Sequence, residues 1–226
     1  MDTSSSDGIN LRLDILPKNT KRAFEFLSKE KWLEKSNWYL AGGTALALQA
    51  GHRQSVDLDF FTKDKNFNNN ELLGHFASNP DWRTDVNNEG TIYGELLGAK
   101  VSFIAYPFFV PSEEYLPFGS INILKSADIA VMKVIAISQR GRKRDFLDLY
   151  WLVHHGESLE NVIGKLKKQY PFVAHDYHHI VKSLVYFDDA EDDPMPEIYF
   201  STTWKEVKAY FSKEVPLAAK RLIDLV

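Results

Sequence analysis

Residues 38–61 read WYLAGGTALALQAGHRQSVDLDFF and contain the pattern that decides the fold. The stretch opens with Trp38 to Leu40, whose aromatic and aliphatic side chains favour a short strand. The glycine pair Gly42-Gly43 predicts a turn, and the alanine- and leucine-rich residues after it favour a helix. From Val56 to Phe61 carboxylates alternate with apolar residues, which is the period of a strand with two unlike faces. We therefore expect a strand, a glycine turn, a helix and a second strand.

The rest of the chain divides into a mixed first half and a helical second half. In the first half we expect helices over residues 18–35 and 70–77 and strands over 82–86, 91–96 and 100–106. In the second half apolar residues recur at helical spacing over 128–138, 143–155, 159–168, 176–187 and 204–225, and the acidic segment 188–193 is expected to be a solvated loop. Ser126 is an expected N-cap and Gly156 an expected helix end. We predict an α/β (α+β) fold with a mixed sheet flanked by helices in residues 1–123, followed by a helical domain in residues 124–226.

The composition excludes several classes of protein. The chain has 226 residues, 44% of them hydrophobic, which is enough apolar material for a core and excludes a disordered chain. The absence of cysteine excludes thiolate zinc sites, disulfide scaffolds and thiol nucleophiles. The net charge of -4 argues against nucleic-acid binding through an overall positive field, but it leaves room for local basic patches. Since the sequence shows no leader-like start and no apolar stretch long enough for a membrane, we expect no signal peptide, no membrane span and a cytoplasmic protein.

Two carboxylates in the quoted stretch form a candidate metal site. Asp57 and Asp59 are one residue apart on a predicted strand and so point to the same face. Like charges this close favour a compensating cation, and Mg²⁺ takes carboxylate oxygens while it keeps positions open for phosphate oxygens. The alternative is an edge strand with one solvated face, because this tripeptide pattern is common by chance.

The glycine turn before these acids is a candidate phosphate site. Gly42, Gly43 and Thr44 open a predicted helix, where backbone N–H groups and the helix dipole favour an anion. Arg53 is expected to clamp phosphate, and the Ser55 hydroxyl to contact the nucleotide. The alternative is a tight turn with a threonine cap.

The helical half contributes one lysine and one aspartate to the candidate site. Lys133 is the only charged residue in an otherwise apolar helical segment, so its burial requires a carboxylate or a phosphate partner unless its head reaches water. Asp148 lies too far into its helix to be explained by the helix dipole, and it is expected to pair with Lys133 or Arg144. Asp145, in the first turn of that helix, has such an explanation.

Taken in order, these motifs resemble the AbiEii/AbiGii abortive-infection toxin family of nucleotidyltransferases, over about residues 38–152. The resemblance implies a DNA polymerase beta-like nucleotidyltransferase fold, Mg²⁺-dependent transfer of a nucleotidyl group from an NTP to an RNA (tRNA-like) or protein hydroxyl, and a cognate winged-helix antitoxin. It also implies the role of each matching residue. Metal binding falls to Asp57 and Asp59, nucleotide binding to Gly42, Gly43, Thr44, Arg53 and Ser55, and catalysis to Asp57, Asp59, Lys133 and Asp148.

One position departs from this pattern. Many polymerase-beta-like enzymes place a third carboxylate on a neighbouring strand, and here Ser102 stands at the expected place. Either another acid, such as Glu95 or Asp145, replaces it, or the chain is a degenerate scaffold that binds an NTP or a protein partner without efficient transfer. A glycosyltransferase is a weaker alternative, because only 56 residues precede Asp57.

Two further groups of residues are open to more than one interpretation. The histidines His175, His178 and His179 have spacings that suit zinc but lack any nearby thiol or obvious third ligand, so a structural role is favoured. The basic residues from Arg140 to Arg144 suit either an RNA-facing edge or a solvated surface.

Overall fold

The structure of the chain, a computed structural model, describes the backbone of residues 11–223 and the side chains of residues 11–220. The residues before position 11, where no signal peptide is expected, and the predicted helix end at Leu225 lie outside the described residues. Within the described part, no helix is long and apolar enough to cross a membrane.

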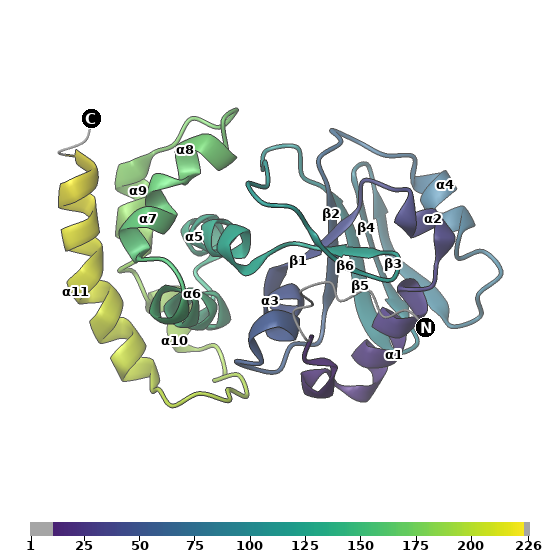
Figure 1. The fold of residues 1–226 in the computed structure, drawn as a ribbon, viewed down its shortest axis with the longest axis horizontal. Coiled ribbons are helices and arrows are strands. Elements are labelled where there is room, and N and C mark those ends of the chain that lie inside the picture. Colours follow the sequence, from purple (N-terminus) through teal and green to yellow (C-terminus); the bar gives the residue numbers. More distant parts are fainter. Residues whose placement is uncertain (1–10, 224–226) are drawn as a thin grey trace, which may run out of the picture.

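A mixed seven-stranded sheet is built from the first half of the described chain (Figure 1). Strand β2 lies at its centre, parallel to β5 and antiparallel to β1, and β1 runs parallel to β7. The outer pairs β3–β4, β4–β5 and β6–β7 are antiparallel. The order across the sheet is β3-β4-β5-β2-β1-β7-β6, with the bounds β1 Tyr39–Ala41, β2 Leu58–Thr62, β3 Trp82–Asn88, β4 Thr91–Leu96, β5 Ala99–Ala105, β6 Leu116–Phe118 and β7 Ile121–Ile123.

One face of the sheet is packed against short helices. These are α1 (Lys18–Leu27), α2 (Lys31–Glu34) and α4 (Asn69–Gly74), and the rings of Trp32 and Phe76 contact Phe103 in the middle of β5 at centroid distances of 6.1 and 6.0 Å. Because strand residues alternate between faces, Phe60 and Phe103 point into this core while Asp59 and Ser102 point to the opposite face. The buried rings therefore fix the register that turns the polar residues toward the other side.

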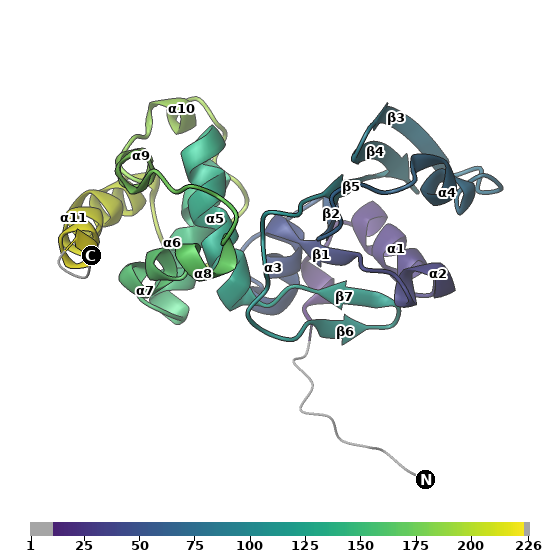
Figure 2. The same ribbon diagram turned by 90° about the horizontal axis from the view of Figure 1, so that it is seen from above.

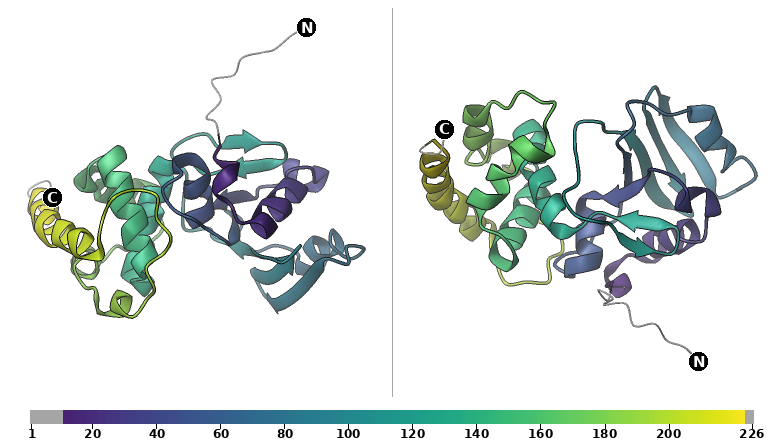
Figure 3. Two further views of the ribbon diagram at one scale, coloured as in Figure 1. Left: turned by 90° about the horizontal axis from the view of Figure 1, so that it is seen from below. Right: turned by 45° about the horizontal axis from the view of Figure 1, so that its top comes forward.

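The helical half lies at one end of the sheet, and the β3–β4 hairpin turns away from it (Figure 2). Helix α3 (Gly42–Ala50) connects β1 to the loop before β2 and contacts both α5 and α6, so it lies between the sheet and the helical half (Figure 3). The helices of this half are α5 (Ser126–Arg140), α6 (Lys143–His155), α7 (Leu159–Gly164), α8 (Leu166–Gln169), α9 (Tyr177–Ser183), α10 (Asp188–Glu191) and α11 (Trp204–Ile223).

A backbone tie joins the two halves at the loop that precedes β2. Gln54 N–H donates to the carbonyl of Glu197, and Tyr199 N–H donates to the carbonyl of His52, at 2.9 and 2.8 Å. The segment between α10 and α11 thus pairs with residues 52–54 and backs the loop that leads to Asp57.

Several expectations about single elements are wrong in detail. The helix expected over 18–35 is interrupted after Leu27, the one over 159–168 is divided at Lys165, and the one over 176–187 ends at Ser183. Strands β6 and β7 were not expected, because three-residue strands carry almost no periodic signal. Ser126 is the first residue of α5 and makes no side-chain cap, whereas the expected end of α6 at Gly156 is confirmed. The acidic segment is not simply solvated, because it contains α10 and Asp193 binds Arg142 and the Lys143 N–H.

Candidate active site

The glycine turn at the start of α3 is shaped by two close approaches. Gly42 has φ +72°, a conformation that favours glycine, and a Cβ there would lie 3.2 Å from Asp59 Oδ2. A Cβ on Gly43 would lie only 2.4 Å from Arg53 Nη2. The turn therefore needs a glycine at 42 for its backbone and at 43 for the guanidinium packed against it.

The buried Thr44 connects this turn to the loop that carries the acids. Its hydroxyl lies 2.9 Å from Ser55 Oγ and also hydrogen-bonds the carbonyl oxygen of Asp57. The cap position of α3 is Ala41, which makes no side-chain cap, so the threonine-cap interpretation is wrong. Thr44 instead holds residues 55–57 against the helix start.

The two carboxylates lie where the loop enters β2. Asp57 immediately precedes the strand and Asp59 lies inside it, and both face the same cleft. Burial and the neighbouring Asp57 raise the pKa of Asp59, whereas a 2.7 Å hydrogen bond from Ser102 Oγ to Asp59 Oδ1 lowers it. The guanidinium of Arg144 lies 3.7 Å from Asp57 Oδ2. The protein offsets the repulsion between these two carboxylates only in part, and a cation bound between them would offset the rest.

Ser102 occupies the position where a third carboxylate was expected. It is the direct neighbour of Asp59 in the β2–β5 register, and its side chain is almost fully buried. Neither suggested replacement faces the cleft: Glu95 pairs with Arg83 on the outer strands, and Asp145 is held between Lys133 and Arg140. Within the described residues the metal-facing acids are therefore a pair.

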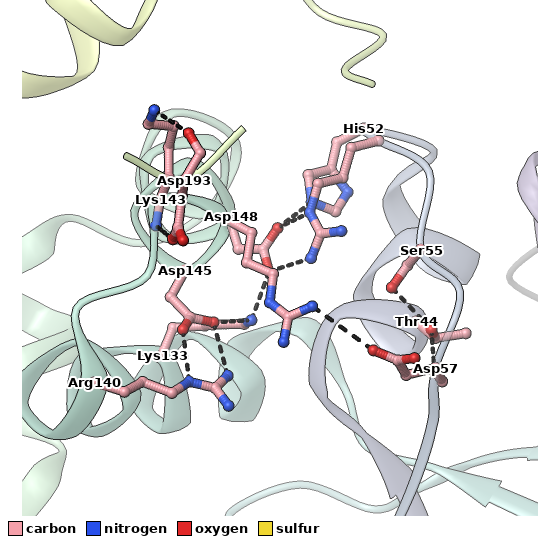
Figure 4. A network of polar contacts seen from close by, with 12 residues as sticks. Thr44, His52, Ser55, Asp57, Lys133, Arg140, Lys143, Asp145, Asp148 and Asp193 are labelled. Carbon is pink, nitrogen blue, oxygen red and sulfur yellow. Dashed lines mark hydrogen bonds and ion pairs between the residues drawn. The ribbon is translucent and has the colours of Figure 1, made fainter. Parts of the chain in front are cut away.

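A buried network of charges lies next to the turn, between the loop before β2 and helices α5 and α6 (Figure 4). Asp148, which has no exposed surface, accepts hydrogen bonds from His52 Nε2 at 2.8 Å and from Arg53 Nε and Nη2 at 2.5 and 2.8 Å. Lys133 Nζ lies 2.6 Å from Asp148 and 2.7 Å from Asp145, so the expected partner of Asp148 is Lys133 and not Arg144. The network thus joins the loop before β2 to the two helices.

The charges of this network do not cancel. Burial alone raises the pKa of Asp148, but its contacts with Arg53 and Lys133 hold that pKa well below its usual range. Burial lowers the pKa of His52, which keeps this ring neutral near pH 7. The charged members are the cations Lys133, Arg53 and the half-exposed Arg140 and the anions Asp145 and Asp148, which leaves one positive charge in excess. This charge partly offsets the neighbouring acids Asp57 and Asp59. It also lies next to the glycine turn, where helix N–H groups favour an anion.

Arg53 does not lie in the cleft as a free phosphate clamp. Its Nε and Nη2 are bound to Asp148 and its Nη1 donates to the Gln54 carbonyl at 2.8 Å. The guanidinium still lines the cleft beside Gly43, so it contributes charge and supports the turn. Lys133 Nζ donates a hydrogen bond to Asp145, forms an ion pair with Asp148 and also lines the cleft, which leaves a donor for a ligand.

His52 and Arg140 belong to this network but were not among the candidate residues. The sequence gives little indication of a role for His52, since a histidine next to an arginine matches no motif. Arg140 lies in the basic run, for which the sequence suggests an RNA-facing edge or a solvated surface and not a buried partner.

A cleft of about 390 Å³ joins these groups. It is lined by the turn, both acids, Lys133 and Arg144, together with apolar residues that include Phe61, Ile104 and Met132. A second groove of about 460 Å³ begins at Arg53, Ser55 and Arg144 and continues past Arg142. Of the basic run, Lys143 points inward and Arg140 binds Asp145, so Arg142 and Arg144 face this groove. Arg142 is paired there with Asp193, and Glu197 also lines the groove.

The residues of the cleft fit Mg²⁺. Asp57 and Asp59 supply two hard oxygen ligands, and Mg²⁺ is commonly held by one or two carboxylates together with waters and substrate phosphates. No cluster of three or more acidic, histidine or cysteine side chains suited to a metal occurs among the described residues, so the pair is the site to consider. His175 and His179 instead hydrogen-bond backbone carbonyls, in keeping with a structural role.

The fold and the family of the chain are those of nucleotidyltransferases. A solved structure of a candidate nucleotidyltransferase from H. pylori has the same fold, with a TM-score of 0.54, 21% identity, and coverage of 93% of this chain and 99% of that one. The family described as "Nucleotidyl transferase AbiEii toxin, Type IV TA system" matches residues 26–222, and the chain belongs to this family.

Two further proteins are similar to the chain. The uncharacterized protein aq_aa25 of Aquifex aeolicus (strain VF5) is 39% identical over 184 residues, which cover 80% of this chain and 87% of the relative. MenT4, a nucleotidyltransferase toxin from Mycobacterium tuberculosis H37Rv, superposes with a TM-score of 0.49 and 15% identity over 90% of this chain and 86% of that one.

Proposed function

We propose that the chain is a Mg²⁺-dependent enzyme that transfers a nucleotidyl group from an NTP to a hydroxyl of an RNA (tRNA-like) or protein acceptor, as the toxin of a toxin–antitoxin pair in the cytoplasm. The observation that carries the proposal is the composition of one cleft. A pair of acids, a glycine turn and the donor left on Lys133 face each other there, next to a network with excess positive charge.

Different residues of the cleft bind the phosphates and the metal in this proposal. The turn at Gly42 and Gly43 opens α3, where free backbone N–H groups favour the terminal phosphates. Lys133 Nζ donates its remaining hydrogen to the same phosphates, and Arg53 adds charge from behind the turn. When bound at Asp57 and Asp59, Mg²⁺ supplies charge neutralisation and alignment of the phosphates.

The chemical step is an in-line displacement. The acceptor oxygen forms a bond to the α-phosphorus, the bond from that phosphorus to the bridging oxygen breaks, and pyrophosphate leaves with the electron pair. The hydroxyl proton is lost to solvent. The partly exposed Asp57 keeps this end of the cleft open to water and to the acceptor.

The groove next to the cleft favours a polyanionic acceptor. Arg142 and Arg144 line it together with Asp193 and Glu197, and both arginine side chains are about half exposed. Arg142 is paired with Asp193, so Arg144 is the main basic group offered to an acceptor. Arginines at a groove suit the phosphates of an RNA better than a neutral protein hydroxyl. Membership of a type IV toxin–antitoxin family implies an antitoxin, and we propose a winged-helix protein in that role.

Incorporation of α-³²P-labelled NTPs into total RNA and protein tests the proposal. The wild type should label an acceptor with Mg²⁺ and not with EDTA, and Asp57→Asn and Lys133→Ala should lose the label while they remain folded by circular dichroism. The matched control is Asp85→Asn, which removes an exposed carboxylate on β3 that pairs with Arg83. Label transfer that survives Asp57→Asn contradicts the proposal.

A second function is favoured by one observation. Ser102 leaves the cleft with two acids where many related folds have three, which suits a scaffold that binds NTP without transfer. In that case calorimetry detects NTP binding to the wild type while no acceptor is labelled.

A further inference from the structure

The two ends of the cleft differ in chemistry in the same way as the two ends of a nucleotide. On the cleft-facing side of β2, Asp57 and Asp59 are followed by Phe61, which lies beside Ile104 and contacts Tyr106 at 5.7 Å between ring centroids, so the apolar side chains begin where the acids end. A nucleoside triphosphate has a charged tail and a flat ring whose faces are apolar and whose edge is polar. Only one orientation places each part of it in matching surroundings.

We propose that the apolar end of the cleft is the nucleobase subsite, in which the base stacks beside Tyr106 and Gln139 reads its edge. The proposal rests on the proposed function, because it requires an NTP in the cleft. It adds the residues that select among NTPs.

The ring of Tyr106 is held in place before any ligand binds. It makes edge contacts with Phe61 and Phe108, both at 5.7 Å between ring centroids, and with Tyr170 at 6.2 Å. Its hydroxyl lies 3.3 Å from the Tyr170 hydroxyl. A ring fixed in this way stacks on a base without the entropy cost of ordering a free side chain.

Gln139 has the position and the chemistry to read a base. Met132, Ala136 and Gln139 follow each other at spacings of four and three on α5, so they lie along one side of the helix. Gln139 is six residues after Lys133, which is about 9 Å along the helix axis, and it lines the cleft together with Tyr106. Its exposed amide makes no hydrogen bond with the described residues, and it has both donors and an acceptor to offer.

A neighbouring groove supplies the matched control. This groove, of about 360 Å³, shares Tyr106, Ile135 and Gln139 with the cleft and continues toward α9. Ser138 lines the groove but not the cleft. Substitution of Gln139 should therefore change the affinity for a base bound in the cleft, and substitution of Ser138 should not.

The test is calorimetry of the full chain with Mg²⁺ and five probes: ATP, GTP, CTP, UTP and inorganic tripolyphosphate. Tyr106→Ala should weaken binding of the NTPs by roughly five- to a hundredfold, the size of a lost stacking contact, and leave tripolyphosphate within twofold. Gln139→Ala and Gln139→Glu should change the ratios among the four NTP dissociation constants by about fivefold or more, because a single hydrogen bond to the base is gained or lost. Ser138→Ala should leave these ratios within twofold. Since Gln139 is exposed, its variants keep the test valid if Tyr106→Ala does not fold.

Each other outcome has a definite meaning. If the ratios among the four NTP dissociation constants are unchanged in both Gln139 variants, the base subsite is overturned. The proposed function still stands in that case, because the variants bind NTPs. A change of ratios in Ser138→Ala equal to that in Gln139→Ala places the base in the neighbouring groove and also overturns the proposal. If neither the NTPs nor tripolyphosphate bind the wild type, the proposed function and the base subsite fail together.

Discussion

Replacing Asp148 by asparagine tests the idea that one buried carboxylate holds the two halves together at the site. The substitution keeps the shape of the side chain but removes the charge that faces Lys133 and Arg53, and it turns an amide donor toward groups that are themselves donors. Breaking a buried ion pair by removing one partner costs about 3–5 kcal/mol. We therefore expect the free energy of unfolding, from urea or guanidinium titration at pH 7, to fall by about that amount.

The pH dependence gives a second, independent readout. Since the pKa of Asp148 is held well below its usual range in the folded state, its contribution is fully present above the unfolded pKa, about 3.9. It is lost as the pH falls through the lower folded pKa, so the difference between wild type and Asp148→Asn should shrink below about pH 4. The control is Asp85→Asn, whose exposed pair with Arg83 should be worth less than about 1 kcal/mol. A loss under about 1 kcal/mol for Asp148→Asn, or one that is the same at pH 3 and pH 7, refutes the reasoning.

Three further predictions concern the turn and the acids. Gly43→Ala should raise the NTP dissociation constant, measured by calorimetry, more than about tenfold, because its Cβ would meet Arg53 Nη2, which the bond to Asp148 holds in place. The control Gly74→Ala, which has open space around its Cβ, should bind NTP like the wild type. Without metal, Ser102→Asp should lower the melting temperature, because it buries a third like charge beside Asp59. Mg²⁺ should then raise the melting temperature of this variant more than that of the wild type in differential scanning fluorimetry. Equal shifts would count against a metal at this place. Arg144→Ala should weaken binding of tripolyphosphate by a few-fold and leave the melting temperature nearly unchanged, since this side chain is about half exposed.

The sequence predicts the sheet side of the site better than the helical side. Two local patterns predict this side: the alternation of carboxylates and apolar residues through Asp57 and Asp59, and the glycine pair before them. The residues of both patterns lie at the cleft. The burial of Lys133 and its pairing with Asp148 were also predictable, because a single charge in an apolar helix has few other solutions.

What the sequence could not predict are contacts between segments far apart in the chain. Arg53 looked like a phosphate clamp because nothing near it in sequence occupies its guanidinium; its partner, Asp148, is 95 residues away. The same holds for Ser102, whose hydrogen bond to Asp59 spans 43 residues and becomes visible only with the strand register. The short strands β6 and β7 are defined by their neighbours in the sheet and not by their own residues.

The backbone tie between residues 52–54 and the segment after α10 has a consequence for synthesis. The loop before β2 needs the carbonyl of Glu197 for the N–H of Gln54, and its His52 carbonyl accepts from the N–H of Tyr199. A growing chain that has not yet added these residues lacks the support behind Arg53 and the glycine turn. A polypeptide that ends before Glu197 therefore does not carry the completed loop of the cleft, so the cleft depends on residues synthesised about 140 positions after Asp57.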